Sequence, residues 1–420
     1  MIKQYYKQAM QLWKSNPLFA TISILATGLT ITFVMVLYMV YAIRTVDISP
    51  EINRSRTLYS NNGYSYLTKD HSKANRGMSY NAAKTIFGNL EHAETVSYFT
   101  YKGEGVGFIG TSQSDFDKGI VSTVDDNYFK IFNYDFIKGE PFTKEQADAA
   151  RKEAIITDKI AIKFFNTTDV IGKEIRIGLS SYFKITGVVK SMSSVFNKAY
   201  SDVWIVVDKN SMNWESSEDL RGNCITAIVA KQGSSLKQLN KEIEENVKKL
   251  NDNLREFTFE LEMNTHAQSN FFEDSKINPA RIFVVLIFIL LIVPAINMSG
   301  LLSTQLKKRS SEVGIRKAYG ASNSQVAKQL LYENFILTIV GGIIGLLFSV
   351  ITIFVFKDAF LSDLMTFNVS DSFHLPLKAL FRPSLFLLAF IFCLLINLLS
   401  AIIPVWSASK KTIIETIKGE

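Results

Sequence analysis

The segment Gln305–Gln329, QLKKRSSEVGIRKAYGASNSQVAKQ, lies between two long apolar runs, and the rest of the chain is interpreted outward from it. It carries several lysines and arginines but a single acid, Glu312. Basic residues beside apolar spans are typical of loops on the cytoplasmic side of a membrane. The segment therefore predicts a cytoplasmic loop between two membrane spans, and a topology signal alone would explain its charge.

The spacing inside this segment predicts more structure than a topology signal requires. Glu312 and Arg316 are four residues apart, which predicts an ion pair on one helix face. Gly320 is suited to end a helix, and Ser322 with Gln325 has the spacing of a capping box that begins the next one. The pattern predicts a short helix and a tight turn between two spans. This shape slightly favours a rigid handle on which another protein acts.

Apolar runs occur four times, and each is long enough to cross a hydrocarbon core of about 30 Å. The expected fold class is a membrane protein with four transmembrane α-helices and a large α+β extracytoplasmic domain inserted between the first and second. Lysines precede the first run and Asp47 and Glu51 follow it, which predicts that both termini are cytoplasmic. The expected transmembrane helices are residues 18–43, 279–304, 330–356 and 383–406.

The polar segments between and beside these runs complete the expected organisation. In residues 1–17 the apolar side chains recur at helical spacing, which predicts a cytoplasmic amphipathic helix in the headgroup layer. A basic leader that only orients the first span is an equal alternative. The other expected segments are the extracytoplasmic domain 44–278, the cytoplasmic coupling segment 305–329, the extracytoplasmic loop 357–382 and the cytoplasmic tail 407–420.

The inserted domain mixes strand-like and helical patterns, which is typical of an α+β fold. The expected helices are Asn81–Leu90, Asp158–Phe165 and Ser235–Leu254. The expected strands are Thr95–Tyr101, Gly105–Ile109, Glu153–Thr157, Lys173–Ile177, Tyr182–Val189, Val203–Val207, Ile225–Ala230 and Phe257–Leu261.

Signals of catalysis are missing from the sequence. It contains no phosphate-binding loop and no zinc-protease or nucleophile-elbow motif, and its four histidines are scattered singly. No cofactor or metal is therefore expected in this chain, and an enzyme is not predicted. The formal charge of +7 lies beside the apolar runs, so we expect a lipid bilayer as its partner and no nucleic acid.

Gly341 and Gly345 form a small-xxx-small pair in the third apolar run. Such pairs let two membrane helices approach closely, which predicts helix packing here. The alternative is that glycine is simply frequent in membrane helices. The spacing leaves open whether the partner helix belongs to the same chain.

Several stretches resemble ABC transporter permeases of the MacB and FtsX type. Ser311–Ser322, SEVGIRKAYGAS, is similar to their E-I-G-I-R-K-A-x-G-A-S signature. The tail Pro404–Lys418 resembles their closing pattern, with Ile413 where proline is usual. In the inserted domain, Val121–Phe142 and the stretches after it resemble the MacB-type periplasmic core domain in order. The resemblance covers nearly the whole chain.

The resemblance implies a mechanotransmission transporter in a bacterial cytoplasmic (inner) membrane. In that family the permease is a dimer, here a homodimer or a heterodimer. Each half binds a cytoplasmic ABC ATPase whose ATP-driven motion passes to the outer domain for export or extraction, with a periplasmic or outer-membrane partner in some complexes. Carried over, the ATPase contact falls on Glu312, Ile315, Arg316, Lys317 and Tyr319.

One departure from the family pattern concerns ATP. MacB carries its ATPase in the same chain, whereas this sequence holds no phosphate-binding loop, so the ATP is expected on a separate subunit. The substrates of MacB therefore do not carry over. Two other functions are compatible with the same architecture. One is an FtsX-like regulator of an extracytoplasmic cell-wall hydrolase, and the other is a membrane-anchored sensor. FtsX outer domains are generally smaller, which argues against the first.

Overall fold

The chain divides into two compact units, which are described separately. The computed structural model describes residues 17–112, 115–178, 180–193, 195–213, 218, 220–271, 277–361 and 383–410. The helical unit comprises Met1–Ala42, Ala280–Phe360 and Pro376–Glu420, and the α+β unit comprises Ile43–Pro279 and Leu361–Leu375. The predicted amphipathic helix, most of the predicted loop 357–382 and the end of the tail lie outside the described residues.

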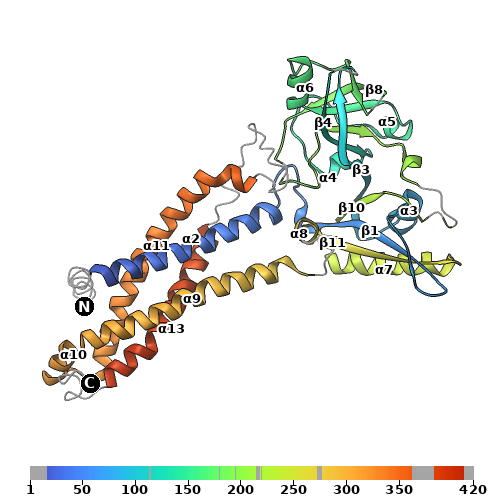
Figure 1. The fold of residues 1–420 in the computed structure, drawn as a ribbon. Helices are drawn as coiled ribbons and strands as arrows, with labels where there is room; N and C mark the ends of the chain where they lie inside the picture. Colours follow the sequence, from blue (N-terminus) through green and yellow to red (C-terminus); the bar gives the residue numbers. More distant parts are fainter. Residues whose placement is uncertain are drawn as a thin grey trace. The chain divides into compact units, whose positions relative to one another are not determined.

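Long helices make up the described part of the helical unit, with one short helix between two of them (Figure 1). They are α2 (Pro17–Thr45), α9 (Pro279–Lys308), α10 (Ser310–Ala318), α11 (Asn323–Leu361) and α13 (Pro383–Lys410). Among the described residues, α2, α11 and α13 are long and apolar enough to cross a membrane. The remaining predicted span falls in α9, whose apolar stretch Pro279–Ile292 is shorter. Each predicted run is thus helical, and three have the length and composition of a span.

Small apolar clusters join these helices. One cluster draws on α2, α9 and α13, and a second packs α2 against α11; their buried members are Ile31, Val34, Met35, Leu291 and Cys393 in the first, and Ala20, Ile24 and Leu337 in the second. Large apolar side chains such as Phe354, Leu388 and Ile403 remain exposed on α11 and α13. Exposed apolar surface of this extent is typical of helices whose solvent is lipid.

The α+β unit contains one sheet with strand order β11-β1-β10-β3-β4-β9-β6-β8-β5, with β2 on β1 and β7 on β3 and β8. Most neighbours are antiparallel, whereas β4 with β9 and β6 with β8 are parallel. The strands are β1 (Thr57–Leu67), β2 (Lys73–Arg76), β3 (Ala93–Gly110), β4 (Phe116–Val124), β5 (Phe136–Gly139), β6 (Glu153–Thr157), β7 (Glu174–Ile177), β8 (Ser181–Val189), β9 (Val203–Val206), β10 (Ile225–Ala230) and β11 (Phe257–Thr265).

The helices of this unit cover two separate cores. Leu239 and Ile243 of α7 pack with Ile86 of α3 and Phe259 of β11 in one core, and α6 covers a second core built on β6, β8 and β9. The helical elements are η1 (Arg54–Arg56), α3 (Tyr80–Phe87), α4 (Tyr128–Ile131), α5 (Lys144–Asp148), α6 (Asp158–Phe165), η2 (Lys209–Met212), α7 (Leu236–Asn253) and α8 (His266–Phe271). The predicted helix Ser235–Leu254 is α7, with Ser235 as its cap.

Three predictions in this unit were wrong in their boundaries. The strand expected to end at Leu261 is β11, which continues to Thr265. The segments Thr95–Tyr101 and Gly105–Ile109 belong to the single strand β3, which pairs with β4 on both sides of a register shift. Backbone pairing with a neighbour sustains a strand through glycines that interrupt its sequence pattern. The helix expected to reach Leu90 ends at Phe87, where Gly88 caps it.

Candidate functional site

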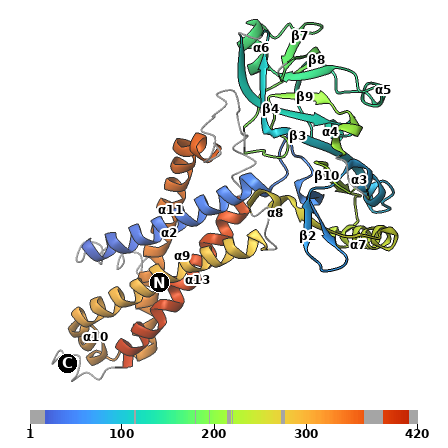
Figure 2. The same ribbon diagram turned by 45° about the vertical axis from the view of Figure 1, so that its right-hand side comes forward.

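The predicted cytoplasmic segment folds as the end of α9, all of α10 and the first turns of α11 (Figure 2). Glu312 lies in the first turn of α10, and Arg316 and Lys317 lie in the last. This order of charges complements the helix dipole and stabilises a helix of only nine residues. The short helix expected from the sequence is therefore present.

A left-handed glycine ends α10. Gly320 has φ +92°, its N–H donates to the Lys317 carbonyl over 2.9 Å, and the Ala321 N–H donates to the Arg316 carbonyl over 3.1 Å. These two bonds form a Schellman motif, which favours glycine because a side chain resists this φ. The chain consequently reverses within a few residues, as predicted.

A capping box begins α11. The Gln325 N–H donates to Ser322 Oγ over 3.3 Å, and the Ser322 N–H donates to Gln325 Oε1 over 2.9 Å. Both bonds were expected from the spacing of the two residues. They fix where α11 starts and so fix the turn after α10.

An apolar cluster holds the inner side of α10. Val313 packs with side chains from α9, α11 and α13, and the buried members of the cluster are Leu306, Val313, Val326, Leu330 and Val405. Lys317 adds a polar anchor, because its Nζ donates to the Ser409 carbonyl in the last turn of α13 over 2.7 Å. α10 is thereby braced against three other helices of its unit.

A buried ion pair fixes the corner between α9 and α10. The Arg309 side chain is 13% exposed and donates to Glu333, which is 4% exposed, over 2.8 Å. Gln329 also donates to Glu333. Because a buried charge is costly without a partner, this pair opposes any separation of α11 from the corner.

The predicted ion pair between Glu312 and Arg316 was wrong. Arg309 Nε donates instead to Glu312 Oε2 over 3.0 Å, and no ion pair between Glu312 and Arg316 occurs within the described part of the chain. The corner before α10 brings Arg309 to the first turn of the helix, where it competes successfully for the carboxylate. Arg309 and Glu312 are three residues apart, so their spacing also permitted this pair, and the structure shows which of the two forms.

The outer face of α10 carries exposed side chains. Ile315 is 54% exposed and Tyr319 is 90% exposed, and the two are four residues apart on one helix face. Glu312 is also exposed, whereas Arg316 and Lys317 are half-buried. The five predicted contact residues thus divide into an outward group of Glu312, Ile315 and Tyr319 and a pair closer to the body of the unit.

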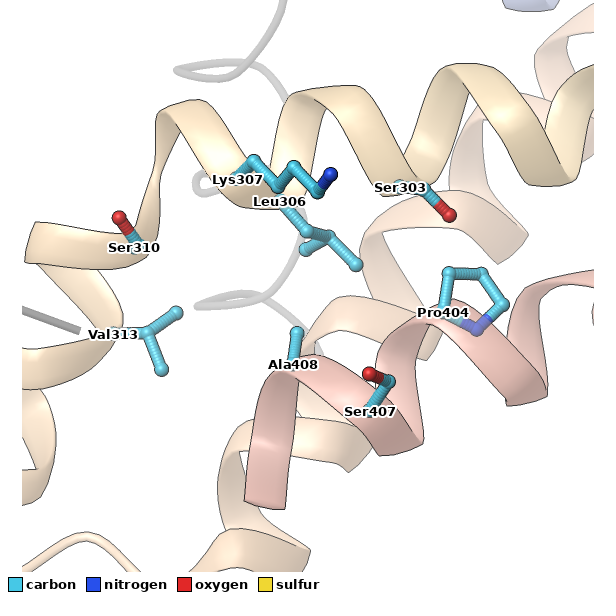
Figure 3. Close-up of a pocket in the computed structure, with 8 residues that line it drawn as sticks. All are labelled: Ser303, Leu306, Lys307, Ser310, Val313, Pro404, Ser407 and Ala408. Atoms are coloured by element: carbon cyan, nitrogen blue, oxygen red, sulfur yellow. The ribbon is translucent and has the colours of Figure 1, made fainter. Parts of the chain in front are cut away.

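A cavity of about 130 Å³ lies behind this helix, between α9, α10 and α13. Figure 3 shows Leu306 and Val313 pointing into the space that separates α10 from α13. Its lining is apolar apart from three serines and one lysine: Ser303, Leu306, Lys307, Ser310, Val313, Pro404, Ser407 and Ala408. The space is small and lined by packed side chains of α9, α10 and α13, so it is a packing feature between these helices.

Gly341 and Gly345 lie against α2. A Cβ atom at Gly345 would come within 2.6 Å of the Gly28 carbonyl oxygen, and one at Gly341 within 2.8 Å of Thr27 Cβ. The Thr32 hydroxyl donates to the Gly345 carbonyl over 3.1 Å. The helix that faces these glycines therefore belongs to the same chain.

A buried charged cluster in the α+β unit was not expected from the sequence. Arg54 Nε donates to Glu51 Oε2 over 2.7 Å, and Arg54 Nη1 donates to the carbonyls of Ile43 and Val46 over 2.6 and 3.0 Å. His266 Nε2 lies 3.3 Å from Glu51 Oε2. The cluster ties the beginning of this unit to its end, residues that are far apart in sequence.

The titratable groups of this cluster are shifted by their surroundings. Burial alone would raise the pKa of Glu51, but Arg54 and His266 hold it at about 2. Burial lowers the pKa of His266. Across the described residues, no group of three or more His, Cys, Asp or Glu side chains could hold a metal ion. The hydrogen bonds from Arg54 to the carbonyls of Ile43 and Val46 make the cluster a structural tie.

Comparison with known families gives two matches that together cover most of the chain. A family model described as a MacB-like periplasmic core domain matches residues 18–246, which is more than half of the chain. A model described as the FtsX-like permease C-terminal domain matches residues 283–413. The second match includes all of α10 and both Gly341 and Gly345 of α11.

Individual relatives are distant. The macrolide export ATP-binding/permease protein MacB of Shewanella sp. is 24% identical over 236 residues, which are 54% of this chain and 34% of that protein. The pyoverdine export ATP-binding/permease protein PvdT of Pseudomonas fluorescens is 26% identical over 224 residues, 53% of this chain and 33% of that protein. The uncharacterized ABC transporter permease YknZ of Bacillus subtilis is 23% identical over 227 residues, 54% and 55% of the two chains. The matched region thus spans about a third of each export protein.

Proposed function

Because this chain belongs to the ABC transporter permeases of the MacB/FtsX type, we propose that it is the permease subunit of a mechanotransmission complex. In this proposal a separate cytoplasmic ABC ATPase binds ATP and moves the α10 handle, and the membrane helices pass the motion to the α+β unit. The output is export or extraction of a substrate. The chain itself supplies a force-bearing connection and no catalysis.

The exposed pair Ile315 and Tyr319 on a braced helix is the observation that carries this proposal. A helix that receives force must expose contact groups on one side and be fixed on the other. α10 has both properties, because Val313 is buried in a cluster shared with three helices and Lys317 is bonded to α13. Tyrosine is also one of the residue types that dominate the energy of protein–protein contacts.

The names of the relatives support an export function. Two of them are named for export of macrolides and of pyoverdine, and both are described as ATP-binding as well as permease proteins. We propose export by the same principle for this chain, without assigning either substrate. The proposed setting is a dimer in a bacterial cytoplasmic membrane with both termini in the cytoplasm.

Co-purification with the proposed ATPase subunit tests the handle. Tyr319→Asp and Ile315→Asp should each reduce the ATPase recovered from detergent-solubilised membranes at least tenfold, because a charge replaces the apolar contact. Stimulation of ATP hydrolysis by the permease should fall in parallel. Ser324→Asp is the matched control, since it adds the same charge at an exposed position in the first turn of α11, where a helix tolerates it.

The proposal would be contradicted by variants of α10 that behave like the control. If both substitutions on α10 leave ATPase recovery and stimulated hydrolysis at the level of Ser324→Asp, the handle is not the contact. Thermal unfolding of each purified variant separates loss of contact from loss of fold.

A further inference from the structure

The sheet of the α+β unit ends at β11, which pairs with β1 on one side and with no other described strand. Gly63 of β1 lies opposite Leu261 of β11. Its carbonyl accepts from the Gly77 N–H and so points away from β11. This pair is therefore a non-hydrogen-bonded pair of the antiparallel ladder, and the backbone N–H and C=O of Leu261 point outward from the sheet.

Side chains cap part of this outer edge. Asn251 of α7 donates to the Phe259 carbonyl over 2.9 Å and accepts from the Phe259 N–H over 2.8 Å. Gln268 accepts from the Thr265 N–H over 3.0 Å. Between these two positions lie Leu261 and Met263, where no described side chain supplies such a cap. The edge is thus open over a short central stretch.

A groove of about 630 Å³ follows this open stretch. One wall is a single face of α7, and the other is a run of consecutive residues of β11, from Thr258 to Asn264. Consecutive residues point to alternate faces of a strand, so a groove that touches all of them follows the edge of the strand. Figure 1 shows α7 running alongside β11.

The dimensions of the groove suit an extended peptide. Seven residues of β11 line it, which corresponds to about 20 Å of strand at about 3.3 Å per residue. The α7 wall from Asn240 to Asn251 extends for a similar length, about 17 Å at about 1.5 Å per residue. A segment of about six extended residues would fill it.

The two faces of the edge differ in chemistry. On the face toward α7, the partly buried side chains of Val247, Leu261 and Met263 pack against the core. Glu260 and Glu262 alternate with them and point to the opposite face, and Glu244 lies on the α7 wall. The lining has Lys248 as its one basic residue, so the formal charge of the groove is negative.

We propose that this edge binds an extended segment of a partner protein, which adds to the sheet as a strand beside β11. Such binding takes affinity from main-chain hydrogen bonds and specificity from the alternating side chains. The alternation of β11 selects a segment with apolar residues toward α7 and basic residues toward Glu260 and Glu262. This surface belongs to the α+β unit, so the inference stands independently of the ATPase contact.

A peptide of seven residues with alternating valine and lysine tests this selection. Its fluorescent form should bind the purified full-length protein in detergent at least tenfold more tightly than a valine–glutamate peptide of equal length, as measured by anisotropy. Glu260→Lys and Glu262→Lys should each weaken binding at least threefold. Glu245→Lys, on an exposed part of α7 outside the groove, should leave it unchanged.

Backbone methylation tests strand addition itself. Methyl groups on the backbone nitrogens of the valines block hydrogen bonding along one edge of the peptide. Methyl groups on the backbone nitrogens of the lysines block it along the other edge. Strand addition requires that one methylated peptide loses binding while the other retains it, and the sensitive edge gives the strand direction. Equal binding by both methylated peptides, or no preference for lysine over glutamate, would overturn the proposal.

Discussion

Glu51 makes the stability of the α+β unit depend on pH. Its folded pKa of about 2 lies below its ordinary value of 4.5, because Arg54 and His266 outweigh the effect of burial. The stabilisation it contributes is therefore complete above pH 4.5 and is lost as the pH falls from 4.5 toward 2. His266 acts in the same direction, since burial lowers its pKa from 6.5 and stability is lost as the pH falls below that value.

Asp125 contributes in the opposite direction in this range, because burial raises its pKa to about 6. The wild type is therefore compared with His266→Asn, which retains Asp125. As the pH is lowered from 6.5 to 4.5, the melting temperature of the wild type should decrease relative to that of His266→Asn, because the variant has no imidazole to protonate. Below pH 4.5 both melting temperatures should decrease as Glu51 is protonated. Scanning calorimetry or tryptophan fluorescence reports the transition. A wild-type melting temperature that changed with pH in the same way as that of His266→Asn between 6.5 and 4.5 would refute the assignment.

Single residues differ in how well they can be predicted from the sequence. The capping box of Ser322 with Gln325 and the helix end at Gly320 are local, so their spacing is sufficient. The pairing of Arg309 with Glu333 spans 24 residues and depends on how α9 and α11 pack. The partners of Glu51 are also distant, with His266 more than two hundred residues away. Local capping can be predicted from the sequence pattern, whereas long-range charge pairing cannot.

At the scale of elements, the close contact between α2 and α11 depends on glycines, which have no side chain to hold the two helices apart. Gly345→Val should disrupt it, because a Cβ would lie 2.6 Å from the Gly28 carbonyl oxygen, which is backbone and cannot move alone. Overpacking of this kind typically costs about 1–3 kcal/mol. Gly300→Ala in α9 is the control, since its Cβ meets nothing within 4 Å. A thermal shift assay should show a lower melting temperature for Gly345→Val alone.

Equal melting temperatures for Gly345→Val and Gly300→Ala would show that the two helices separate without penalty.

Sequence patterns can also mislead about single elements. The glycines of α11 have a readable spacing, but only the structure identifies α2 as their neighbour. In β1, the sequence Asn61-Asn62-Gly63 has the composition of a turn, yet the strand continues through it with a bulge against β11.

At the scale of the whole molecule, the division into a helical unit and an α+β unit was predictable, because long apolar runs are typical of membrane-spanning helices and the polar segment mixes strand and helix patterns. The arrangement of the sheet was not, since β1 and β11 pair across about two hundred residues of intervening chain. Antiparallel partners so distant in sequence leave no periodic signal. The resemblance to a family supplied the functional interpretation that spacing alone could not.

The proposed transmission of force should change amide hydrogen exchange in parts of this chain that lie far from the ATP-binding subunit. The Arg54 cluster joins the first residues of the α+β unit, Ile43 and Val46, to His266 near its end, so motion of either end should change the opening of this cluster. We expect that ATP, added to the complex of this chain with its ATPase, alters amide exchange in η1 and α8. Tyr319→Asp should abolish the change while leaving exchange without ATP as in the wild type. Mass spectrometry of peptides from these elements measures both, and a change that persisted in Tyr319→Asp would show that the motion does not enter through α10.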